Sequence, residues 1–600
     1  MNSKGIYCEL VFPRRLGLLT YIVPERLREV IRPGMLVEAP LRKRSSRGVV
    51  FRLREDVENV SEMEVLEVKE LLLNFPVLTE GLLKLLEWLR KYYLSEEGTI
   101  LRSMVPSFLF NKKRLGSVKA QLESSQTVSD HYEASLIMED ILRTGRLLNI
   151  LESRGRGGVI ILAPSVEVVK KVREYLNPFY SERLILYHSM LRASELEKNY
   201  MGLLSKEPPD PIIIGMRNAV FAPIRPSMII VLDEPSSAYK QEETPYLHAR
   251  DVAVMRAYIE RIPVILSSEH PSVETFYNVR TGKYRLIEPE KKARQRVQIT
   301  VQRIRRNPSG NAEVLSERLL RQIEETIRKG ERVLLLLPRT GYSLIYCRDC
   351  GKVLKCGCEG ITIFFKEEGI LRCRVCESEM TVPVLCPYCK GSGLEYRSVG
   401  IERIQEIVRN RFSISSSEGQ DNIVVQTAAK TSKDGGFLMG VILDADIILN
   451  IPDFRSTERL FHEIYYLKEK LVEGGRIILQ TRFPEYEVFR FLRNLDYRGY
   501  AISELRVRRL HRLPPFSRLF LLRISSRKSF NEEMLYEYLR QIHGGHIQRL
   551  NIKRKRKKAG KHQTGFLIRL PAGSSTEAME GIISSLTTQG MDVRLEADPL

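Results

Sequence analysis

Short, continuous apolar runs separated by amphipathic segments dominate the middle of the chain. Five such runs lie between Ala134 and Glu290, and further runs follow from Arg332. Strands buried on both faces of a parallel sheet are apolar throughout, and the amphipathic segments between them suit covering helices. The pattern therefore predicts two α/β units, with strands at 159–163, 183–187, 211–215, 228–233 and 262–266 in the first and at 332–337, 441–445 and 476–480 in the second.

Both ends of the chain follow other patterns. Short runs with turn residues between them, at 21–24, 33–38 and 48–53, predict a small β-barrel-like domain. Thr79 can cap a helix with leucines along one face, and a Glu97-Gly98 turn and the segment 100–106 follow. Residues 111–130 are polar, serine-rich and aperiodic, which predicts a linker. From Leu519 we expect strand, helix, basic loop, strand, helix and strand.

Eight of the nine cysteines form four tight doublets. Two cysteines with a short spacer can direct both sulfurs at one metal ion, and two such knuckles complete a tetrahedral four-thiolate site. Eight cysteines therefore suit two zinc ions. A site with four cysteine ligands leaves no position for water, so we expect these sites to be structural. The doublets are Cys347-x-x-Cys350, Cys356-x-Cys358, Cys373-x-x-Cys376 and Cys386-x-x-Cys389.

Four knuckles can combine into two sites in three ways. We favour a nested arrangement, because it brings both ends of the insert together and leaves the host domain undisturbed. The outer pairs (Cys347, Cys350, Cys386 and Cys389) would hold one ion, and the inner pairs (Cys356, Cys358, Cys373 and Cys376) the other, on an antiparallel ribbon through Ile361–Ile370. The Cys356-x-Cys358 doublet is one residue shorter than the usual knuckle, which would distort the inner site. The alternative of disulfides or spare thiols fits poorly with four tight doublets and no signal peptide.

Charge indicates a polyanionic partner. The chain has 95 Lys and Arg against 74 Asp and Glu, a formal net charge of +21. Nucleic acid is the first candidate and an anionic membrane the second, and the alternative is heavy use of Lys and Arg throughout the organism. Met1–Val11 has no long apolar core and no run of eighteen apolar residues occurs, so we expect neither a signal peptide nor a spanning helix. The expectation is a cytoplasmic protein without a membrane partner.

Ordered motifs along nearly the whole chain resemble those of the PriA family of bacterial replication-restart proteins. They are Asp233-Glu234 with 239–243 and 248–253, the segments 187–189 and 214–223, Arg339–Tyr342 before the cysteine insert, 443–446, 452–456 and 458–459 after it, and Pro514–Phe516 and Asp598-Pro599 toward the end. The resemblance implies a multidomain α/β protein with two RecA-like helicase lobes, the second carrying an inserted double zinc-binding ribbon.

The resemblance also implies the domain order. We expect an N-terminal DNA-binding β domain at 1–75, a winged-helix module at 76–110, a linker at 111–130, lobe 1 at 131–305, lobe 2 at 306–345 and 391–515, the zinc insert at 346–390, and a C-terminal α+β DNA-binding domain at 516–600.

The catalytic motifs depart from the family pattern. The family's phosphate-binding loop, GxxxxGK followed by Ser or Thr, wraps phosphates with backbone N–H groups and a lysine. Counting back from Pro164 places it near Ser135–Leu142, which has no glycine and no lysine but carries Glu139 and Asp140. At the position of the family's DEEH motif this chain has Asp233-Glu234-Pro235-Ser236, and residues 267–270 occupy the position of its SAT-type motif. The family's arginine motif is replaced by other residues around 462–470. We assign no catalytic and no nucleotide-binding residue, and ATP binding is not expected.

These departures predict a protein that binds forked or single-stranded DNA, recognises abandoned forks and assembles the primosome without a working ATPase. The alternative is an active ATP-dependent 3′→5′ DNA helicase with an atypical nucleotide site. A third candidate is a ribosome- or RNA-associated zinc protein. The family implies single-strand binding protein and the machinery that loads the replicative helicase as partners, and we expect a monomer. Candidate DNA contacts are Tyr21, Arg42, Lys43 and Arg44, and the run Lys553, Arg554, Lys555, Arg556, Lys557 and Lys558.

Overall fold

The computed structural model contains two compact units. One comprises Met1–Pro289, Gly573–Ser584 and Arg594–Pro599, and the other Glu290–Ala572 and Ser585–Val593, with Leu600. The structure describes residues 6–55, 65–111, 131–153, 156–289, 297–304, 315–337, 344–350, 352–357, 362–365, 369–373, 378–397, 401–412, 422–427, 435–451, 453–527, 530–543, 547–550 and 562–599. Of the predicted linker at 111–130, only Asn111 is among these residues. The basic run Lys553–Lys558 lies entirely outside them.

Five antiparallel strands form the N-terminal sheet, in the order β2-β1-β4-β3-β5. Ile22, at the end of the edge strand β2, bridges to Glu67 just before the other edge strand. This bridge brings the regions of the two edge strands together, and the barrel-like form of this region stays a prediction. The strands are β1 (Tyr7–Val11), β2 (Leu19–Ile22), β3 (Met35–Leu41), β4 (Arg44–Arg54) and β5 (Glu70–Pro76).

Three helices follow this sheet, α1 (Glu80–Tyr93), α2 (Glu97–Met104) and α3 (Phe108–Asn111). Thr79 caps α1 as predicted, because its side chain accepts a hydrogen bond from Leu82 N at 3.3 Å. The predicted Glu97-Gly98 turn is wrong, since this pair begins α2. Gly98 lies against backbone carbonyls, and a Cβ there would come within 2.0 Å of the Arg14 carbonyl oxygen. No strand of a wing occurs between residues 77 and 111, all of which are described.

Seven parallel strands form the main sheet of the first unit, in the order β12-β6-β11-β10-β7-β9-β8. All five predicted strands are present, as β7 (Gly158–Leu162), β8 (Leu184–Tyr187), β9 (Ile212–Gly215), β10 (Pro226–Leu232) and β11 (Val264–Ser267). Strands β6 (Ala134–Ile137) and β12 (Arg285–Ile287) are additional. Because Ser135–Ile137 pair with β11, the loop expected at 135–142 begins at residue 138 and runs to 145.

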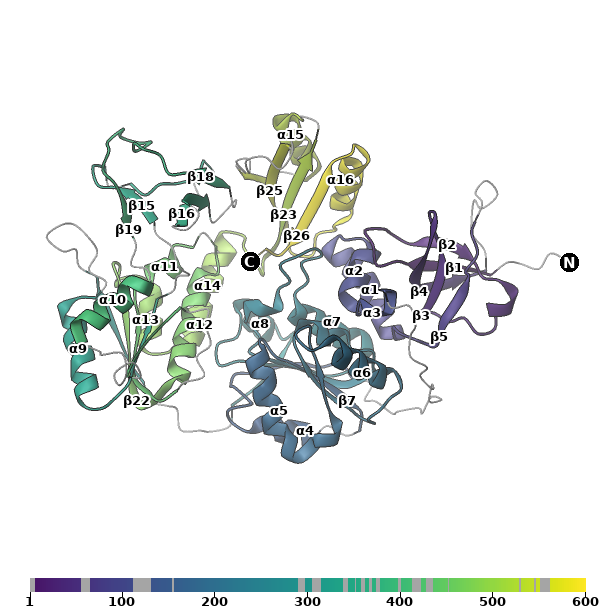
Figure 1. The fold of residues 1–600 in the computed structure, drawn as a ribbon, viewed down its shortest axis with the longest axis horizontal. Helices are drawn as coiled ribbons and strands as arrows, with labels where there is room; N and C mark the ends of the chain where they lie inside the picture. Colours follow the sequence, from purple (N-terminus) through teal and green to yellow (C-terminus); the bar gives the residue numbers. More distant parts are fainter. Residues whose placement is uncertain are drawn as a thin grey trace. The chain divides into compact units, whose positions relative to one another are not determined.

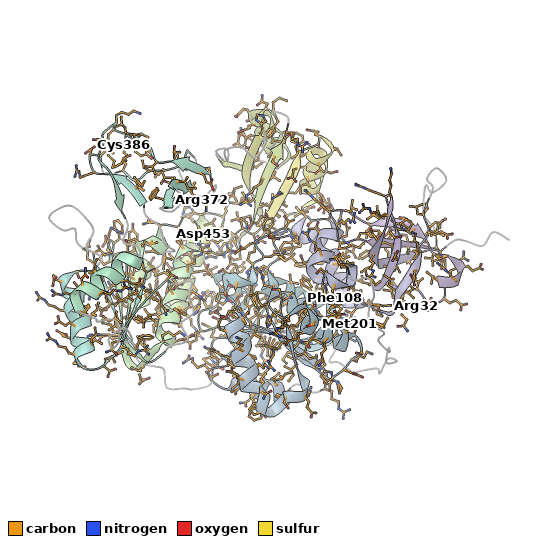
Figure 2. All side chains as sticks on the ribbon, in the orientation of Figure 1. Arg32, Phe108, Met201, Arg372, Cys386 and Asp453 are labelled. Atoms are coloured by element: carbon orange, nitrogen blue, oxygen red, sulfur yellow. The ribbon has the colours of Figure 1, made fainter. Side chains whose placement is uncertain are left out.

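Helices cover both faces of this sheet (Figure 1). Leu147 of α4 and Val172 and Leu176 of α5 are fully buried against one face, and α7 contacts β10 and β11. Phe108 of α3 lies beside α6 (Figure 2), with its ring edge-on to Tyr200 at 5.8 Å between centroids. The helices are α4 (Arg146–Ser153), α5 (Val166–Tyr180), α6 (Ala193–Leu204), α7 (Ala249–Glu260) and α8 (Val273–Arg280).

Five parallel strands form the sheet of the second unit, in the order β13-β22-β21-β14-β20. The three predicted strands are confirmed as β14 (Val333–Leu336), β21 (Phe437–Ile442) and β22 (Leu471–Thr481). Strand β20 (Ile423–Gln426) is additional. We expected lobe 1 to extend to residue 305. Strand β13 (Gln298–Arg303) instead pairs with β22 and so belongs to the sheet of the second unit.

Helices α9 (Glu317–Arg328) and α10 (Ile401–Phe412) pack on one face of this second sheet. Helix α12 (Ser456–Glu469) approaches β21 so closely that a Cβ on Gly440 would lie 2.5 Å from Leu467 Cδ1. Glycine is therefore required at this crossing. The remaining helices of this region are α11 (Asp446–Leu449), α13 (Glu487–Arg493) and α14 (Tyr497–Leu510).

The C-terminal region follows the predicted order of elements, with one additional strand. A four-stranded sheet has the order β24-β25-β23-β26. The elements are β23 (Ser517–Ser526), α15 (Glu532–His543), β24 (Ile547–Leu550), β25 (His562–Pro571), α16 (Glu577–Thr588) and β26 (Asp592–Ala597), with β24 the strand that the sequence did not predict. Among the helices that the structure describes, none has the length and apolar character needed to cross a membrane.

Candidate metal centre and nucleotide site

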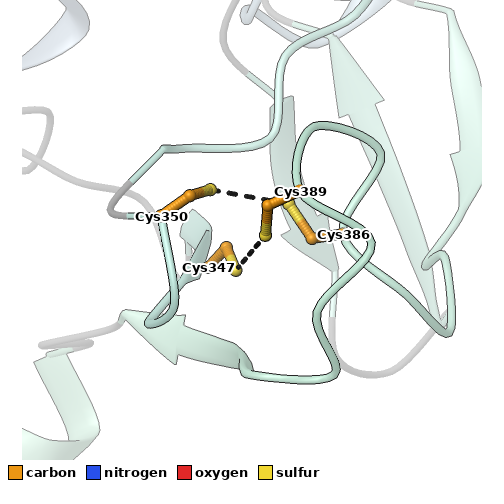
Figure 3. Close-up of side chains that lie close together, drawn as sticks. All are labelled: Cys347, Cys350, Cys386 and Cys389. Atoms are coloured by element: carbon orange, nitrogen blue, oxygen red, sulfur yellow. Dashed lines mark hydrogen bonds between the residues drawn. The ribbon is translucent and has the colours of Figure 1, made fainter.

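The outer two cysteine knuckles converge on one point in the second unit. Cys347 and Cys350 face Cys386 and Cys389 (Figure 3), and all four sulfurs lie within 4.8 Å of one another. The Sγ atoms of Cys347 and Cys389 are 3.5 Å apart, and those of Cys350 and Cys386 are 3.7 Å apart. Four sulfurs placed tetrahedrally at about 2.3 Å from a zinc ion would be about 3.8 Å apart. The outer group of the nested arrangement therefore has the geometry of a metal site.

Local backbone structure builds these knuckles. Strands β15 (Leu344–Cys347) and β19 (Leu394–Arg397) pair antiparallel and bring the two ends of the insert together. The Asp349 carboxylate accepts a hydrogen bond from Gly393 N at 3.0 Å, and a Cβ on Gly391 would lie 2.1 Å from its Oδ2 atom. The glycines therefore let the second knuckle close around Asp349.

The chemistry of Cys386 also suits a metal ligand. Burial acts to raise the pKa of its thiol, but the backbone amides of Cys389 and Tyr388 stabilise the thiolate and bring the pKa down to about 7. In the same group, burial raises the pKa of Cys347, and, against the effect of the Gly391 amide, burial with hydrogen bonds to the other thiols raises the pKa of Cys389 to about 12. Cys386 is therefore the thiol of this group that most readily gives up its proton to a metal ion.

The inner cysteines are described only in part. Cys356 and Cys373 are both buried, whereas Cys358 and Cys376 lie outside the described residues. The predicted ribbon is confirmed, because β16 (Thr362–Phe365) and β17 (Ile370–Cys373) pair antiparallel, and β18 (Glu379–Thr381) adds a third strand. The second four-cysteine site thus stays a prediction.

The loop after β6 in the first unit is bonded by its own acidic side chain. Asp140 Oδ1 accepts hydrogen bonds from Leu142 N at 3.0 Å and Arg143 N at 3.2 Å. These amides lie in the loop between β6 and α4, which starts at the carboxyl end of a parallel strand. Ser267 adds a further bond, since its hydroxyl donates to the Glu139 carbonyl at 2.7 Å. The loop amides at 142 and 143 therefore already have an anionic acceptor from the chain.

Two arginines balance the charge of this loop. Arg146 donates to the buried Glu139 carboxylate at 2.9 Å, and Arg143 forms an ion pair with Glu269. The predicted window of 135–142 missed Arg143 and Thr144, which stand at the end of the loop as a cation followed by a hydroxyl. Strand β6 ends at Ile137, so the loop starts three residues later than expected. Knowing this end from the sequence would have included both residues in the loop.

Glu234, at the end of β10, is fully buried and engaged through both oxygens. Oε1 accepts from Ser272 N at 2.5 Å, and Oε2 accepts from Arg250 at 3.0 Å and from the Ser272 hydroxyl at 3.2 Å. Burial raises the pKa of Glu234, and the charge of Arg250 opposes that rise. Asp233 before it has a left-handed backbone, with φ of 46°. Both oxygens of the Glu234 carboxylate are thus engaged by hydrogen bonds within the protein.

Acidic groups at the carboxyl edge of the second sheet are also paired. Arg482 donates to both carboxylate oxygens of Asp444 and to Asp446, each at 2.8 Å. Asp444 and Asp446 follow β21, and Arg482 follows the neighbouring strand β22. In both sheets, therefore, an arginine forms ion pairs with the acids that follow the carboxyl ends of the strands.

Helix α12 occupies the segment where the family's arginine motif is expected. Glu463, in this helix, has a carboxylate oxygen that is buried and makes no hydrogen bond with the described residues. Burial raises its pKa to about 8. A neutral carboxyl group thus lies in the segment that would supply arginines in the family.

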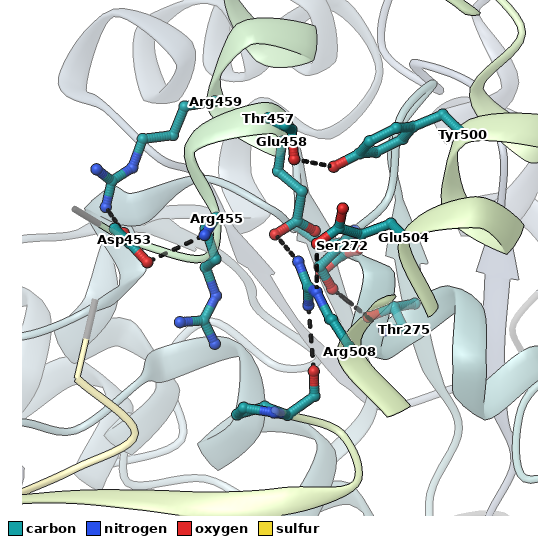
Figure 4. Close-up of polar contacts among 12 residues, drawn as sticks. Ser272, Thr275, Asp453, Arg455, Thr457, Glu458, Arg459, Tyr500, Glu504 and Arg508 are labelled. Carbon is teal, nitrogen blue, oxygen red and sulfur yellow. Dashed lines mark hydrogen bonds and ion pairs between the residues drawn. The ribbon is translucent and has the colours of Figure 1, made fainter. Parts of the chain in front are cut away.

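Arg508 of α14 is fully buried and fastens this helix to α12 (Figure 4). Its guanidinium donates to Glu458 at 2.8 Å, to Glu504 at 2.9 Å and to the Pro514 carbonyl at 3.3 Å. Its planar face lies over the Phe454 ring at 4.9 Å. Two carboxylates in this cluster therefore share the cation of Arg508.

The predicted DNA contacts differ in exposure. Arg42, Lys43 and Arg44 are exposed at the turn between β3 and β4, as phosphate contacts would require. Tyr21 is 4% exposed, and its hydroxyl donates to the Pro40 carbonyl at 2.6 Å. The structure thus gives Tyr21 a packing role in the sheet core, and its contact with DNA stays a prediction, as does that of the exposed cations.

Comparison with known proteins agrees with this architecture. Residues 11–106 match the family model for the 3′DNA-binding domain (3′BD) of PriA. The replication restart protein PriA of Rickettsia conorii is 25% identical over 564 residues, which cover 84% of this chain and 84% of that protein. The Bacillus subtilis PriA is 28% identical over 401 residues, 61% of this chain and 49% of that protein.

A solved structure of RecG bound to a three-way DNA junction is also similar. It is 12% identical, with a TM-score of 0.36, over 70% of this chain and 48% of that chain. A likeness at this level supports no functional conclusion. The chain is a multidomain α/β protein with two parallel sheets and an N-terminal segment that matches a DNA-binding domain. It is similar to PriA proteins over most of its length, and the resemblance inferred from its motifs is confirmed.

We predict that the outer cysteine group binds one zinc ion. Cys386→Ser should lower the zinc content of the purified chain by one ion, because a thiolate ligand is lost. Cys8→Ser is the matched control, since Cys8 is also buried but lies in the N-terminal core. Elemental analysis after dialysis measures the content. An unchanged content in Cys386→Ser would contradict the site.

Replacing Arg508 by methionine should destabilise the second unit. The change removes the cation that Glu458 and Glu504 share, and the loss of one partner from a buried ion pair costs about 3–5 kcal/mol. Urea titration monitored by tyrosine fluorescence measures it, with the exposed neighbour Arg506→Met as the control. Adding Glu458→Gln to Arg508→Met should restore part of the loss. Equal stability of the two arginine variants would exclude the proposed role.

The carboxyl group of Glu463 should make stability depend on pH. Its folded pKa, near 8, lies above the unfolded value, so the stability due to its protonated form is full below about pH 4.5 and is lost as pH rises toward 8. The loss is at most about 1.4 kcal/mol per pH unit in that window. Glu463→Gln should reduce the difference in melting temperature between pH 5.5 and 8.5, whereas Glu469→Gln, at the exposed end of the helix, should not.

Proposed function

We propose that this chain is a replication-restart protein that binds forked or single-stranded DNA and assembles the primosome without an ATP-driven motor. Similarity to PriA over most of the chain supports the first part. The match of residues 11–106 to a 3′DNA-binding domain supports recognition of a DNA end by the N-terminal domain. The exposed cations Arg42, Lys43 and Arg44, together with the basic run Lys553–Lys558, are the proposed phosphate contacts.

Loss of the motor rests on the loop after β6. In a phosphate-binding loop, free backbone amides receive the nucleotide phosphates. Here Asp140 Oδ1 accepts from the amides of Leu142 and Arg143, so the chain supplies its own anion where a phosphate would bind. A second anion would have to displace this carboxylate and approach it against Coulomb repulsion. This hydrogen-bonded loop is the observation that carries the proposal.

Other features support the same function. Glu234 is buried and bonded to Arg250 and Ser272, which leaves no free oxygen for Mg²⁺. Helix α12 carries Glu463 in the segment that supplies arginines to the transferred phosphoryl group in the family. The two sheets would then be RecA-like lobes that serve as a scaffold for DNA and partner proteins.

The zinc insert completes the proposal. We propose two zinc ions per chain, the outer one on Cys347, Cys350, Cys386 and Cys389 and the inner one on the remaining four cysteines. Such ions would stabilise the insert and take no part in catalysis. The partners would be those that the family implies, single-strand binding protein and the machinery that loads the replicative helicase.

An active helicase with an atypical nucleotide site is the second candidate. The observation that favours it is Arg143 followed by Thr144 at the end of the loop, a cation and a hydroxyl in the order that phosphate-binding loops use. In that case Arg143 would leave Glu269 and contact the phosphates of ATP.

ATP hydrolysis distinguishes the two candidates. The full chain should bind forked DNA in a fluorescence-anisotropy titration, yet release no phosphate from ATP above background when the fork is added. Arg143→Gln and Asp233→Asn should leave fork affinity unchanged within twofold, because no Mg²⁺-nucleotide depends on them. DNA-stimulated hydrolysis that Arg143→Gln or Asp233→Asn abolishes would establish the helicase instead. A chain that fails to bind forks would overturn the restart function itself.

A further inference from the structure

A cavity of about 420 Å³ lies between α1 and α7 in the first unit. Its walls come from α1, from the segment that leads into β6, and from the end of α7. Basic and phenolic side chains dominate its lining, and none of them serves the sites described above. The lining residues are Lys84, His131, Tyr132, Tyr258, Ile259 and Arg261.

Close packing of the two helices forms this cavity. Gly81 lets α1 approach α7, because a Cβ there would lie 2.4 Å from the Glu260 carboxylate. Glu260 is held in place by the buried Arg256 at 3.2 Å. Lys84 lies three residues after Gly81 and therefore on the same face of α1, toward the end of α7. Arg261 ends α7 in the left-handed conformation, with φ of 53°, which turns the chain beside Tyr258.

Two tyrosines form one side of the cavity. Their rings meet edge to face, with 5.2 Å between centroids and an angle of 89° between planes. Tyr132 is half-buried, whereas Tyr258 is 60% exposed. Tyr132 thus supports a ring that remains largely open to water, and an exposed aromatic face is a surface on which a nucleobase can stack.

Charge in and around the cavity favours an anion. Lys84 and Arg261 line it as cations. Of the nearby acids, Glu260 is neutralised by Arg256, and Glu80 forms a 2.6 Å pair with Lys84. The Lys84 and Glu80 side chains are 61% and 81% exposed, so this pair is weak and Lys84 can turn toward a ligand.

We propose that this cavity binds one nucleotide of a single-stranded DNA segment, with the base on Tyr258 and the phosphate between Lys84 and Arg261. Its volume suits a ligand of that size, and an aromatic face beside cations is the combination that single-strand binding sites use. The proposal rests on the DNA-binding function proposed above, and adds a contact outside the N-terminal sheet.

Salt dependence of binding to a single-stranded oligonucleotide tests the phosphate contact. In the full chain, Lys84→Gln and Arg261→Gln should each reduce the slope of log affinity against log salt by about one. Lys91→Gln is a close control, because Lys91 forms the same type of i,i+4 pair, with Glu87, and is 63% exposed on the same helix but lies outside the cavity. An equal effect of Lys91→Gln and Lys84→Gln would overturn the proposal.

Substitution of Tyr258 tests the base contact. Tyr258→Ala should weaken strand binding about tenfold, and Tyr258→Phe should retain it, because stacking needs the ring and not the hydroxyl. Phe179→Ala, which removes another exposed ring in the same unit, is the control and should have no effect. A strand carrying 5-iodouracil should crosslink to Tyr258, as mapped by mass spectrometry of the crosslinked peptide. Loss of affinity in Tyr258→Phe equal to that in Tyr258→Ala would contradict stacking.

A free mononucleotide is the other source of the same chemistry. Thymidine monophosphate at millimolar concentration should not displace the strand, since a single nucleotide lacks the remaining backbone contacts. Displacement that depends on Lys84 would instead assign the cavity to a free nucleotide and overturn the proposal. If the unaltered chain binds strands and none of the cavity variants changes that binding, this inference fails while the proposed function stands. If the unaltered chain binds no DNA, the proposed function fails first.

Discussion

Burial of parallel strands on both faces is the constraint on which the rest of this structure depends. Strands such as β7, β9 and β10 are apolar at nearly every position, because helices cover each side of the sheet. Acidic and hydroxyl side chains of the two sheets therefore gather at the carboxyl ends of the strands, where the chain turns away. Asp140, Glu234 and Ser267 gather there in the first unit, and Asp444, Asp446 and Arg482 in the second. In open α/β sheets this is the edge that receives ligands.

At both edges the chain satisfies its acids internally. Arg146 holds Glu139, Arg250 holds Glu234, and Arg482 holds both Asp444 and Asp446. Each pair removes a carboxylate from competition for Mg²⁺ and a cation from competition for phosphate. A working nucleotide site directs such cations at the phosphates and such carboxylates at Mg²⁺. Both edges therefore carry acids that are already bonded to arginines of the same chain.

The sequence predicted the parts of the fold that follow from periodicity. The five apolar runs of the first sheet and the three of the second are all strands, and Thr79 caps its helix, because these features depend on local pattern. It missed β6, because Ser135–Ile137 were assigned to the phosphate-binding loop, and this error placed the loop three residues too early and excluded Arg143. It read Glu97-Gly98 as a turn, because it could not show that Gly98 lies against the Arg14 carbonyl, far away in the chain. The convergence of Cys347, Cys350, Cys386 and Cys389 was predictable because short spacers leave few arrangements.

The pairing of β15 with β19 has a consequence for how the cysteine insert relates to its host. Since the insert begins and ends with the neighbouring antiparallel strands β15 and β19, it is joined to the rest of the second unit through this one strand pair. Fluctuation or oxidation of the thiols can then unfold the insert as an independent cooperative unit without disturbing β14 or β21. The same strand pair makes the insert a portable module. It could be exchanged for a short hairpin, or grafted onto another pair of adjacent strands, with no change in the order of the sheet.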